Sequence, residues 1–495
     1  MRLHQWLPLL TLLTSLLTGL LIFFLREEQA RARTFFNMTG ATVKLIFVGI
    51  MLWGSFHGQN YETRFPLLAH TDFVLRADTL AMLFVALSAV LWFLTTVYAI
   101  GYLEKSPNRS RFFGFFSLCV TATVGIALAG NLLTFFFFYE ILTLSTYPLV
   151  VHRGTPEALR AGSKYLAYTL SGAALLLLGV AWLYVLSAPL EFSAGGVLAH
   201  LEETHRNSLK TIFALLVVGL GVKAALVPLH GWLPSAMVAP APVSALLHAV
   251  AVVKAGAFGI VRVIYDLYGI ELVESLGVNG PLAAVAALTI IYGSLHALVQ
   301  EDLKRRLAFS TVSQLSYIVL GVSIIGPLST IGGLVHLIHQ GIMKITLFFC
   351  AGNIAETLGI HLIREMDGAG RRMPWTMGAF TVAALGMIGL PPVAGFISKW
   401  YLGLGALDAG QAWAVAVLAL STVLNAAYFL PIVYAGWFKE PRTTWPGRDP
   451  HSRLETDWRL LLPTLATAFF SLAAGLLAGL PISPAGWVRL IVSRV

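Results

Sequence analysis

Apolar runs of about 20 residues recur along the whole chain, separated by short polar segments. A run of this length spans a bilayer as an α-helix, and the strict alternation of a membrane β-barrel does not occur in the pattern. The pattern therefore predicts an all-α membrane protein with about fourteen transmembrane helices and no separate soluble domain. The predicted helices cover residues 5–25, 35–54, 79–100, 112–129, 131–150, 165–187, 211–237, 243–265, 281–299, 307–325, 330–355, 374–405, 411–437 and 459–482.

The seventh and twelfth predicted helices are too long and too rich in proline and glycine to be simple rods. They contain "LVPLHGWLP" and "GLPPVAGF". Proline removes a backbone donor, and non-helical backbone at membrane depth is tolerated only where protein buries it or a water-filled cavity meets it. We therefore expect two broken spans. Such spans are the usual sites of coupled ions in transporters, and each break lies within eight residues of a lysine.

The composition agrees with this class, since 57% of the residues are hydrophobic, only 12% are charged and the mean hydropathy is +0.78. The net charge of +9 reflects topology more than nucleic-acid binding. Of the 33 lysines and arginines, 20 fall in one set of alternating loops, 7 in the other set and at the termini, and 6 within helices. The positive-inside rule then places both termini on the non-cytoplasmic side of a bacterial-type inner membrane. The first apolar run is longer than a signal-peptide core and is expected to stay as the first helix.

The sequence offers no signature of a cofactor or metal site. Cys119 and Cys350 are the two cysteines, both within apolar runs and neither in a CxxC pair, so we expect small core residues. No GxxxxGK[ST] loop, dinucleotide-binding motif or metal cluster occurs. The chain therefore needs partner subunits to drive it, or it exchanges one ion gradient for another.

Ionisable residues inside the predicted helices carry the functional signal, because each costs about 2.5–3.5 kcal/mol near the bilayer centre. A desolvated lysine releases its proton more easily and a nearby carboxylate reverses this, so such groups can pass protons along a line. The predicted proton relay consists of Glu140, Lys223, His248, Lys254, His336, Lys344 and Lys399, with His230 and His339 as secondary candidates. Lys44 and Arg262 are expected to extend their charged ends to the membrane surface instead.

The same residues could instead have purely structural roles. Glu140 could form a fixed ion pair with a neighbouring lysine, and any single histidine could join two helices by a hydrogen bond. A haem or quinone protein is a second class, although His336 and His339 share one helix and do not face each other as a ligand pair. A scaffold whose polar line no longer functions is a third class.

An internal repeat organises the chain. Helices four to eight and nine to thirteen form two five-helix units, and an odd helix number inverts the second unit relative to the first. The expected domains are 1–111, the first three helices; 112–266, the first unit; 281–437, the second unit; and 438–495, a cytoplasmic loop and the last helix. Glu140 has no acidic counterpart in "STVSQLSYIVLGVS", nor Lys254 a counterpart in "ALSTVLNAAYFLPIVY".

Four segments resemble the proton-conducting antiporter-like subunits of respiratory complex I, Mrp-type cation/proton antiporters and membrane-bound hydrogenases. They are "VKAALVPLHGWLPSAMVAPAPVSALLHAVAVVKAG", "EDLKRRLAFSTVSQLSYIVLG", "HLIHQGIMKITLFFCAGNI" and "MIGLPPVAGFISKW". The similarity extends over residues 70–435. The chain length, "LSTVLNAAYFLPIVY" and Lys254 resemble most the D-type subunit of Mrp antiporters.

The resemblance implies roles for residues that match the family's motifs. Glu140 matches the essential glutamate and Lys223 the broken-helix lysine. His248 and Lys254 match the eighth-helix relay, His336 and Lys344 the central connection, and Lys399 the exit lysine. One position departs from the pattern, because Gln340 stands where several relatives carry a second histidine, and His339 precedes it.

The resemblance implies a proton-translocating subunit of a multisubunit Na⁺/H⁺ antiporter, without catalytic chemistry or a cofactor of its own. Its expected partners are other membrane subunits, protons, Na⁺ and the lipid bilayer, but not nucleic acid. The alternative is a proton-pumping subunit of a complex I-like oxidoreductase, a hydrogenase or a carbon-uptake complex.

Overall fold

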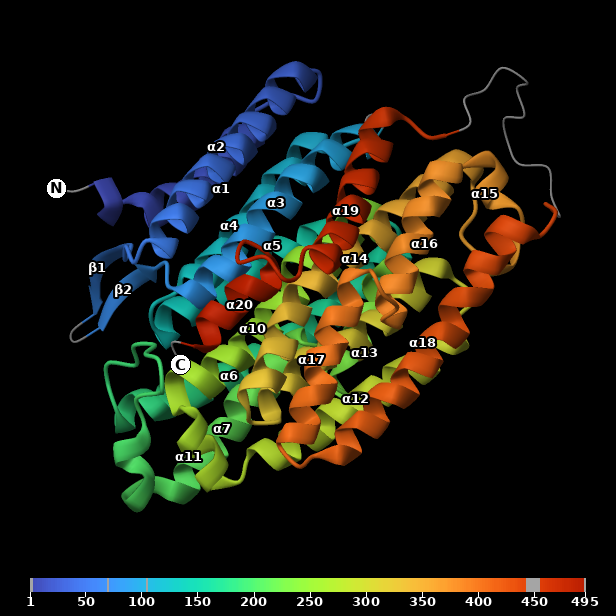
Figure 1. The fold of residues 1–495 in the computed structure, drawn as a ribbon. Coiled ribbons are helices and arrows are strands. Elements are labelled where there is room, and N and C mark those ends of the chain that lie inside the picture. Colours follow the sequence, from blue (N-terminus) through green and yellow to red (C-terminus); the bar gives the residue numbers. More distant parts are fainter. Residues whose placement is uncertain (1–2, 69–70, 104–105, 442–454, 494–495) are drawn as a thin grey trace.

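The computed structural model describes residues 3–68, 71–103, 106–441 and 455–493. Within these ranges the chain is a bundle of long helices, with α1 and α2 on one side and α18 on the other (Figure 1). The helices are α1 (Leu7–Phe23), α2 (Ala30–Phe56), α3 (Thr79–Tyr102), α4 (Arg109–Leu128), α5 (Leu132–Val150), α6 (Pro156–Leu186), α7 (Glu202–Lys223), α8 (Trp232–Ser235), α9 (Ala241–Ala245), α10 (Val252–Arg262), α11 (Ile270–Leu276), α12 (Asn279–Leu298), α13 (Leu303–Ser323), α14 (Pro327–Leu358), α15 (Ala369–Arg372), α16 (Pro374–Ile388), α17 (Ala394–Asp408), α18 (Ala412–Phe438), α19 (Trp458–Leu476) and α20 (Pro484–Val492).

The all-α membrane class is confirmed. Ten helices of the described ranges are long and apolar enough to cross a membrane, and α1 and α16 are shorter apolar helices. Each predicted run coincides with one helix or with a pair of consecutive helices. The count of fourteen transmembrane segments stays a prediction. Some basic residues used to predict the orientation lie outside the described residues, namely Arg2, Lys105, Arg442, Arg448, Arg453 and Arg494.

The two breaks lie where proline and glycine interrupt the apolar pattern. After α7 the backbone turns through Ala225, which has a φ of +55°, and continues in short segments, the 3₁₀ turn η3 (Leu229–Gly231), α8 and η4 (Ala236–Val238). The Trp232 ring nitrogen donates to the carbonyl of Val222 at 2.7 Å and so satisfies one carbonyl at the end of α7. In the twelfth predicted span, Gly389 with a φ of +96° ends α16, and α17 follows after two prolines.

The eighth predicted helix is less regular than the sequence pattern suggested. It begins as α9, passes through a π-helical turn, η5 (Leu246–Val250), continues as α10 and ends in a second π-helical stretch, η6 (Val263–Tyr268). At Ala251 the backbone leaves the helical region, with φ −112° and ψ −88°. Single π turns frequently occur at functional sites, and η5 carries His248.

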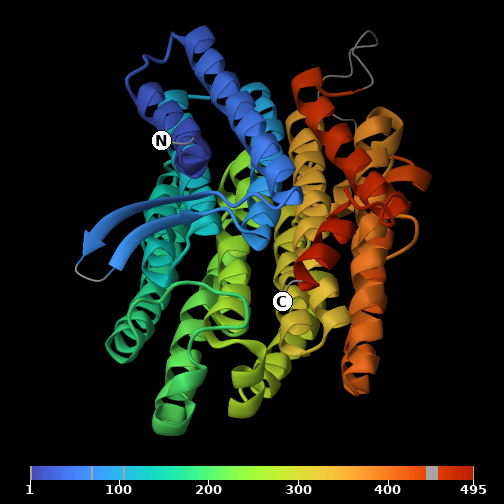
Figure 2. The same ribbon diagram turned by 60° about the vertical axis from the view of Figure 1, so that its left-hand side comes forward.

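The sequence pattern also missed a hairpin. Strands β1 (Glu62–Leu68) and β2 (Thr71–Arg76) pair antiparallel beyond the ends of α1 and α2 (Figures 1 and 2). Arg64 and Arg76 hold it to the α6–α7 connection through ion pairs to Glu191 at 2.7 and 2.9 Å. The opposite end of the bundle is here called the basic end; it is where Tyr102, Arg153, Lys304 and His361 meet.

Helix α14 occupies the centre of the bundle. It has 32 residues, and its most apolar window is buried throughout. It contacts α13, α16, α17, α19 and η5, so it touches elements of both predicted units. Polar residues of α14 are therefore placed where the two halves of the chain meet.

Candidate functional site

The first part of the polar line lies between α5 and α7. Lys223 is fully buried at the end of α7, where its ammonium donates to the carbonyl oxygen of Tyr139 and lies 3.3 Å from the centre of the Tyr139 ring. The neighbouring Glu140 is half-buried, and its Oε1 has no hydrogen-bond partner among the described residues. Glu140 is the residue that follows Tyr139, whose carbonyl oxygen accepts from Lys223. No ion pair is formed between Glu140 and Lys223 within the described ranges, so the fixed-pair interpretation of Glu140 is not supported.

A close backbone approach joins α7 to α10. Gly256 on α10 lies against the end of α7, where a Cβ atom would come within 2.3 Å of the Ala224 nitrogen. Two residues earlier, Lys254 is fully buried and donates to the carbonyl oxygen of Leu337 on α14 at 2.6 Å. His248 is also fully buried, with its ring stacked on Phe348 of α14 at 4.5 Å, and neither ring nitrogen has a described partner. The line therefore continues from α7 through α10 to α14.

Lys344 connects α14 to α13. Lys344 is fully buried and donates to Ser310 Oγ at 2.7 Å and to the Leu307 carbonyl at 3.1 Å. The Tyr428 hydroxyl on α18 donates to the same Ser310 hydroxyl at 3.0 Å. The ammonium is thus linked through Ser310 to a second hydroxyl, and among the described residues no carboxylate forms an ion pair with it.

The last lysine spans the break of the twelfth predicted helix. Lys399 on α17 is half-buried and donates to the carbonyl of Ile388, the final residue of α16, at 2.7 Å. It also donates to Thr422 Oγ1 at 3.2 Å and lies 5.3 Å from the centre of the Tyr317 ring. A cation at a helix C-terminus is favoured by the helix dipole, which gives a reason for a lysine at this break.

The four histidines differ in their surroundings. His336 is fully buried, and its Nδ1 is hydrogen-bonded to Ser398 Oγ at 2.8 Å, so it connects α14 with α17 beside Lys399. His339 is buried on the same helix. His230 is half-buried and packs edge-on against Tyr292 of α12 at 4.9 Å. Of the secondary candidates, His230 therefore lies among aromatic side chains, apart from the lysines.

Each of the four lysines donates to a backbone carbonyl of a neighbouring helix. The contacts join α7 to α5, α10 to α14, α14 to α13 and α17 to α16. Within the described ranges none of them forms an ion pair. A buried ammonium with neutral acceptors keeps a hydrogen bond without a fixed counter-ion.

Two other buried cations correct the sequence-based expectation. Lys44 and Arg262 do not extend to a membrane surface, since Lys44 is fully buried and Arg262 is 2% exposed. Lys44 donates to Ser15 Oγ at 2.7 Å. Arg262 forms ion pairs with Asp78 at 2.8 Å and with Asp266 at 2.6 Å. Both found polar partners inside the bundle, which removes the reason to extend outward.

The hydroxyl groups around the lysines were missed by sequence reasoning. Ser310, Ser398 and Thr422 are hydrogen-bonded to residues of the line. Tyr428 is linked to it through Ser310, and the ring of Tyr317 lies near Lys399. The run "FSTVSQLSY" in α13 is unusually polar for a fully buried helix and could have indicated some of them. Across the described residues, no group of three or more His, Cys, Asp or Glu side chains is placed to hold a metal ion.

These features define a multi-pass helical membrane protein with a line of basic groups through its interior. The chain belongs to the family described as NADH:quinone oxidoreductase/Mrp antiporter, which residues 129–425 match. Residues 68–113 match the N-terminal family of complex I chain 5.

Three relatives illustrate the range of this family. The chain is 37% identical to the N-type subunit of the NADH-quinone oxidoreductase of Desulforudis audaxviator, over 81% of each chain. It is 27% identical to the D-type subunit of the Na(+)/H(+) antiporter of Bacillus subtilis, over 94% of this chain and 93% of that protein. Its fold matches a chain of the Mrp complex from Dietzia sp. with a TM-score of 0.82 and 23% identity, over 99% of this chain and 98% of the other.

Proposed function

We propose that this chain is the proton-translocating membrane subunit of a multisubunit Na⁺/H⁺ antiporter and that it works by a buried relay. The observation that carries the proposal is the set of four lysines bonded to backbone carbonyls, without carboxylate partners among the described residues. An ammonium held by a counter-ion would be fixed in its charged form. One held by neutral oxygens can lose and regain a proton without breaking an ion pair.

The relay is proposed to run through the residues named from the sequence. Glu140 and Lys223 form the gating pair, His248 and Lys254 carry the proton inward, His336 and Lys344 link the halves, and Lys399 opens to the far side. His230 and His339 remain secondary candidates. Atoms of Glu140, His248 and His336 that have no described partner support this route, because buried polar atoms are normally satisfied by protein or by ordered water.

The arrangement in the membrane belongs to the same proposal. We place the basic end at the cytoplasm and both termini on the other side, on the strength of the lysine and arginine distribution. The two inverted units, residues 112–266 and 281–437, are proposed to meet at α14, which belongs to the second unit. Residues 1–111 and 438–495 are proposed to add the first three helices and, after a cytoplasmic loop, the last helix. The expected partners are other membrane subunits of the same assembly, together with protons and Na⁺.

Replacing Lys223 with alanine tests the proposal in the intact complex. Proton movement in inverted vesicles, followed with a pH-sensitive dye after addition of Na⁺, is expected to stop. The matched control is Lys210→Ala, which removes an exposed lysine from the same helix and is expected to leave transport unchanged. Normal proton movement by the Lys223→Ala complex would show that the line is not the pathway.

A second candidate is an antiporter-like subunit of a complex I-like oxidoreductase, a membrane-bound hydrogenase or a carbon-uptake complex. Sequence identity favours this second candidate, because the relative with 37% identity is an oxidoreductase subunit, whereas the relative with 27% identity is an antiporter subunit. The extent of the alignment favours the antiporter, because the antiporter subunit aligns with 94% of this chain and the oxidoreductase subunit with 81%. Purification in mild detergent followed by mass spectrometry distinguishes them, because Mrp-type subunits, redox subunits or a carbon-uptake partner would co-purify.

A further inference from the structure

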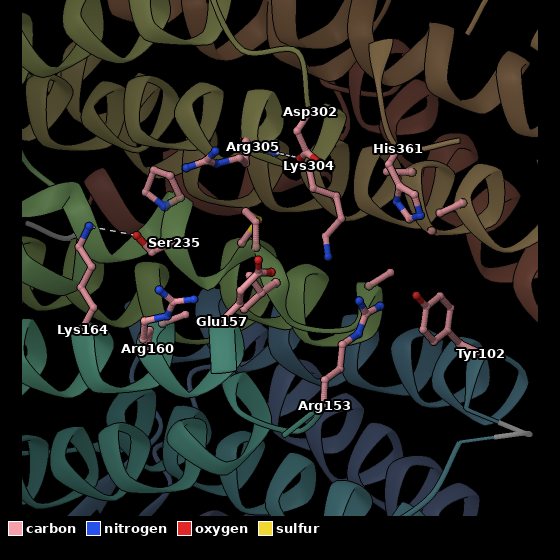
Figure 3. Close-up of a pocket in the computed structure, with 18 residues that line it drawn as sticks. Tyr102, Arg153, Glu157, Arg160, Lys164, Ser235, Asp302, Lys304, Arg305 and His361 are labelled. Carbon is pink, nitrogen blue, oxygen red and sulfur yellow. Dashed lines mark hydrogen bonds between the residues drawn. The ribbon is translucent and has the colours of Figure 1, made fainter. Parts of the chain in front are cut away.

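A cavity of about 660 Å³ lies at the basic end (Figure 3), and none of the four buried lysines of the line belongs to its lining. It is bounded by the first turns of α6 and α13, by the segment that follows the break after α7, and by the last turns of α14. Five of its lining residues are lysines or arginines, here called the cavity cations: Arg153, Arg160, Lys164, Lys304 and Arg305. Two carboxylates, Glu157 and Asp302, also line it, so the lining carries a formal charge of +3.

The cavity cations converge from opposite walls. Glu157, Arg160 and Lys164 follow the spacing of one helix face on α6. Lys304 and Arg305 lie in the first turn of α13, on the other wall. The close-up shows Arg153 and Lys304 extending toward each other across the space (Figure 3). Like charges that face each other across a cavity repel unless an anion lies between them.

None of the cavity cations forms an ion pair within the described ranges. Lys164 donates to Ser235 Oγ at 3.0 Å and Lys304 to the Ala239 carbonyl at 2.5 Å, both neutral acceptors. The carboxylate of Asp302 is occupied as the cap of α13, where it accepts the Arg305 backbone N–H at 2.8 Å.

Other cations of the basic end do find carboxylates. Arg371 pairs with Glu440 at 2.6 Å and Arg109 with Glu27 at 3.6 Å. The positive-inside rule explains why this end is basic, but it does not explain why cations without a described carboxylate partner gather around one cavity.

We propose that this cavity binds a phosphate-bearing anion, either a soluble one or the headgroup of an anionic lipid. Arginine presents a planar fork that matches phosphate oxygens, and three of the five cavity cations are arginines. Two long helices, α6 and α13, begin at the rim, so the positive ends of both dipoles add to the field.

The site also lies next to the break after α7. The carbonyl that accepts from Lys304 belongs to Ala239, which joins η4 to the start of α9. A phosphate that draws Lys304 away would release this carbonyl. The binding site does not depend on the proposed transport function, because none of the proposed relay residues lines the cavity.

Binding to the purified intact complex tests the inference, with two probes that separate the sources. Inorganic pyrophosphate, measured by calorimetry, represents a soluble anion. Nanodiscs containing phosphatidylglycerol or only phosphatidylcholine, followed by native mass spectrometry, represent a lipid headgroup. We expect one of the two phosphate probes to bind once per chain, and phosphatidylcholine not to be retained.

The double variant Arg153→Gln, Arg305→Gln is expected to weaken that binding at least about tenfold, since each loses a charge-assisted hydrogen bond. The control Arg364→Gln removes an exposed arginine of the same end that does not line the cavity, and it is expected to bind as the natural chain does. If the double variant fails to assemble, Arg153→Lys, Arg305→Lys keeps the charge but loses both forks, and about threefold weaker binding is expected.

If the natural complex binds pyrophosphate and the double variant does not, the ligand is a soluble anion. If the natural complex retains phosphatidylglycerol and the double variant does not, the ligand is a lipid headgroup. The proposal is overturned if neither probe binds or if the cavity variants bind as tightly as the Arg364→Gln control. It is also overturned if a zero-length carboxyl–amine cross-linker joins Lys304 to an acidic residue of another subunit, because the cavity would then be a protein interface.

Discussion

Replacing Lys254 with methionine is expected to stop transport without weakening the fold. The side chain is fully buried, and its ammonium makes one hydrogen bond, to the Leu337 carbonyl inside α14. That carbonyl belongs to a continuous helix whose own ladder already uses it, so removing the lysine leaves no orphaned acceptor. Methionine is unbranched and adaptable and can fill the same space.

The magnitude follows from two opposing terms. A lysine near the centre of a membrane helix costs about 2.5–3.5 kcal/mol. A hydrogen bond made by a charged group returns about 1.5–3 kcal/mol. The methionine variant should therefore be as stable as the natural chain or more stable, by between roughly zero and 2 kcal/mol.

Two further variants serve as controls for Lys254→Met. Lys44 is equally buried, but it lies outside the line and donates to Ser15, so Lys44→Met should match Lys254→Met in stability and transport normally. Arg262→Leu removes a cation that pairs with Asp78 and Asp266. The buried carboxylate of Asp266 and the partly exposed carboxylate of Asp78 then lose their partner, and the loss at the buried Asp266 costs about 3–5 kcal/mol.

The assay combines the thermal unfolding temperature of the purified complex with Na⁺-dependent proton movement in vesicles. We expect a stable but inactive Lys254→Met complex, a stable and active Lys44→Met complex, and a destabilised Arg262→Leu complex. A clear drop in the unfolding temperature of Lys254→Met alone would refute the reasoning, because Lys254 would then hold the helices together. Normal transport by that variant would remove Lys254 from the relay.

Two other predictions follow from local geometry and charge. Gly256→Ala places a Cβ atom 2.3 Å from the Ala224 backbone nitrogen, so both the unfolding temperature and transport should fall, whereas Gly378→Ala meets nothing within 4 Å and should be tolerated. At the hairpin, hydrogen bonds from Arg64 lower the pKa of Glu191 below its ordinary value of 4.5. A carboxylate with a lowered folded-state pKa stabilises the fold above pH 4.5 and loses that contribution as the pH falls through the folded value. The protection factors of the hairpin strands, residues 62–68 and 71–76, taken relative to the intrinsic exchange rate at each pH, should therefore fall in acid. Glu191→Gln should lower these protection factors at pH 7 and make them less sensitive to acid. Unchanged protection factors between pH 7 and about pH 3 would contradict this assignment.

Much of the fold could be predicted because the bilayer restricts it strongly. A span of about 20 apolar residues leaves few alternatives to a helix, and proline and glycine mark the breaks after Lys223 and before Lys399. The irregular backbone near His248 could not be predicted in this way, because no proline or glycine stands between Leu246 and Ala251. The π turn there depends on packing against α14, a contact distant in sequence. The hairpin was missed because its strands are short and charged.

The sequence could indicate which buried lysines are candidates for the site, but it could not indicate their hydrogen-bond partners. Lysines in apolar runs are conspicuous, so Lys223, Lys254, Lys344 and Lys399 could be selected from the sequence alone. Which oxygen each one finds depends on how the helices pack. The same uncertainty explains the wrong prediction for Arg262, whose position near a helix end suggested a side chain that extends to the membrane surface. Its carboxylate partners, one in the next turn and one 184 positions away, make it a structural cation instead.

The chemistry around the lysines differs between the two halves, and this difference bears on how a relay could work. In the first half Lys223 donates to the carbonyl oxygen of Tyr139, and the next residue along α5 is the carboxylic acid Glu140. In the second half Lys344 and Lys399 meet the hydroxyls of Ser310 and Thr422. A hydroxyl can pass a proton but cannot hold a net charge near neutral pH, whereas a carboxylate can do both. Among the described residues of the line, Glu140 is therefore the group that can hold a negative charge near a lysine. The hydroxyl groups of the second half are suited to passing protons on. A relay built in this way would be gated at one end, which matches the pairing proposed for Glu140 and Lys223.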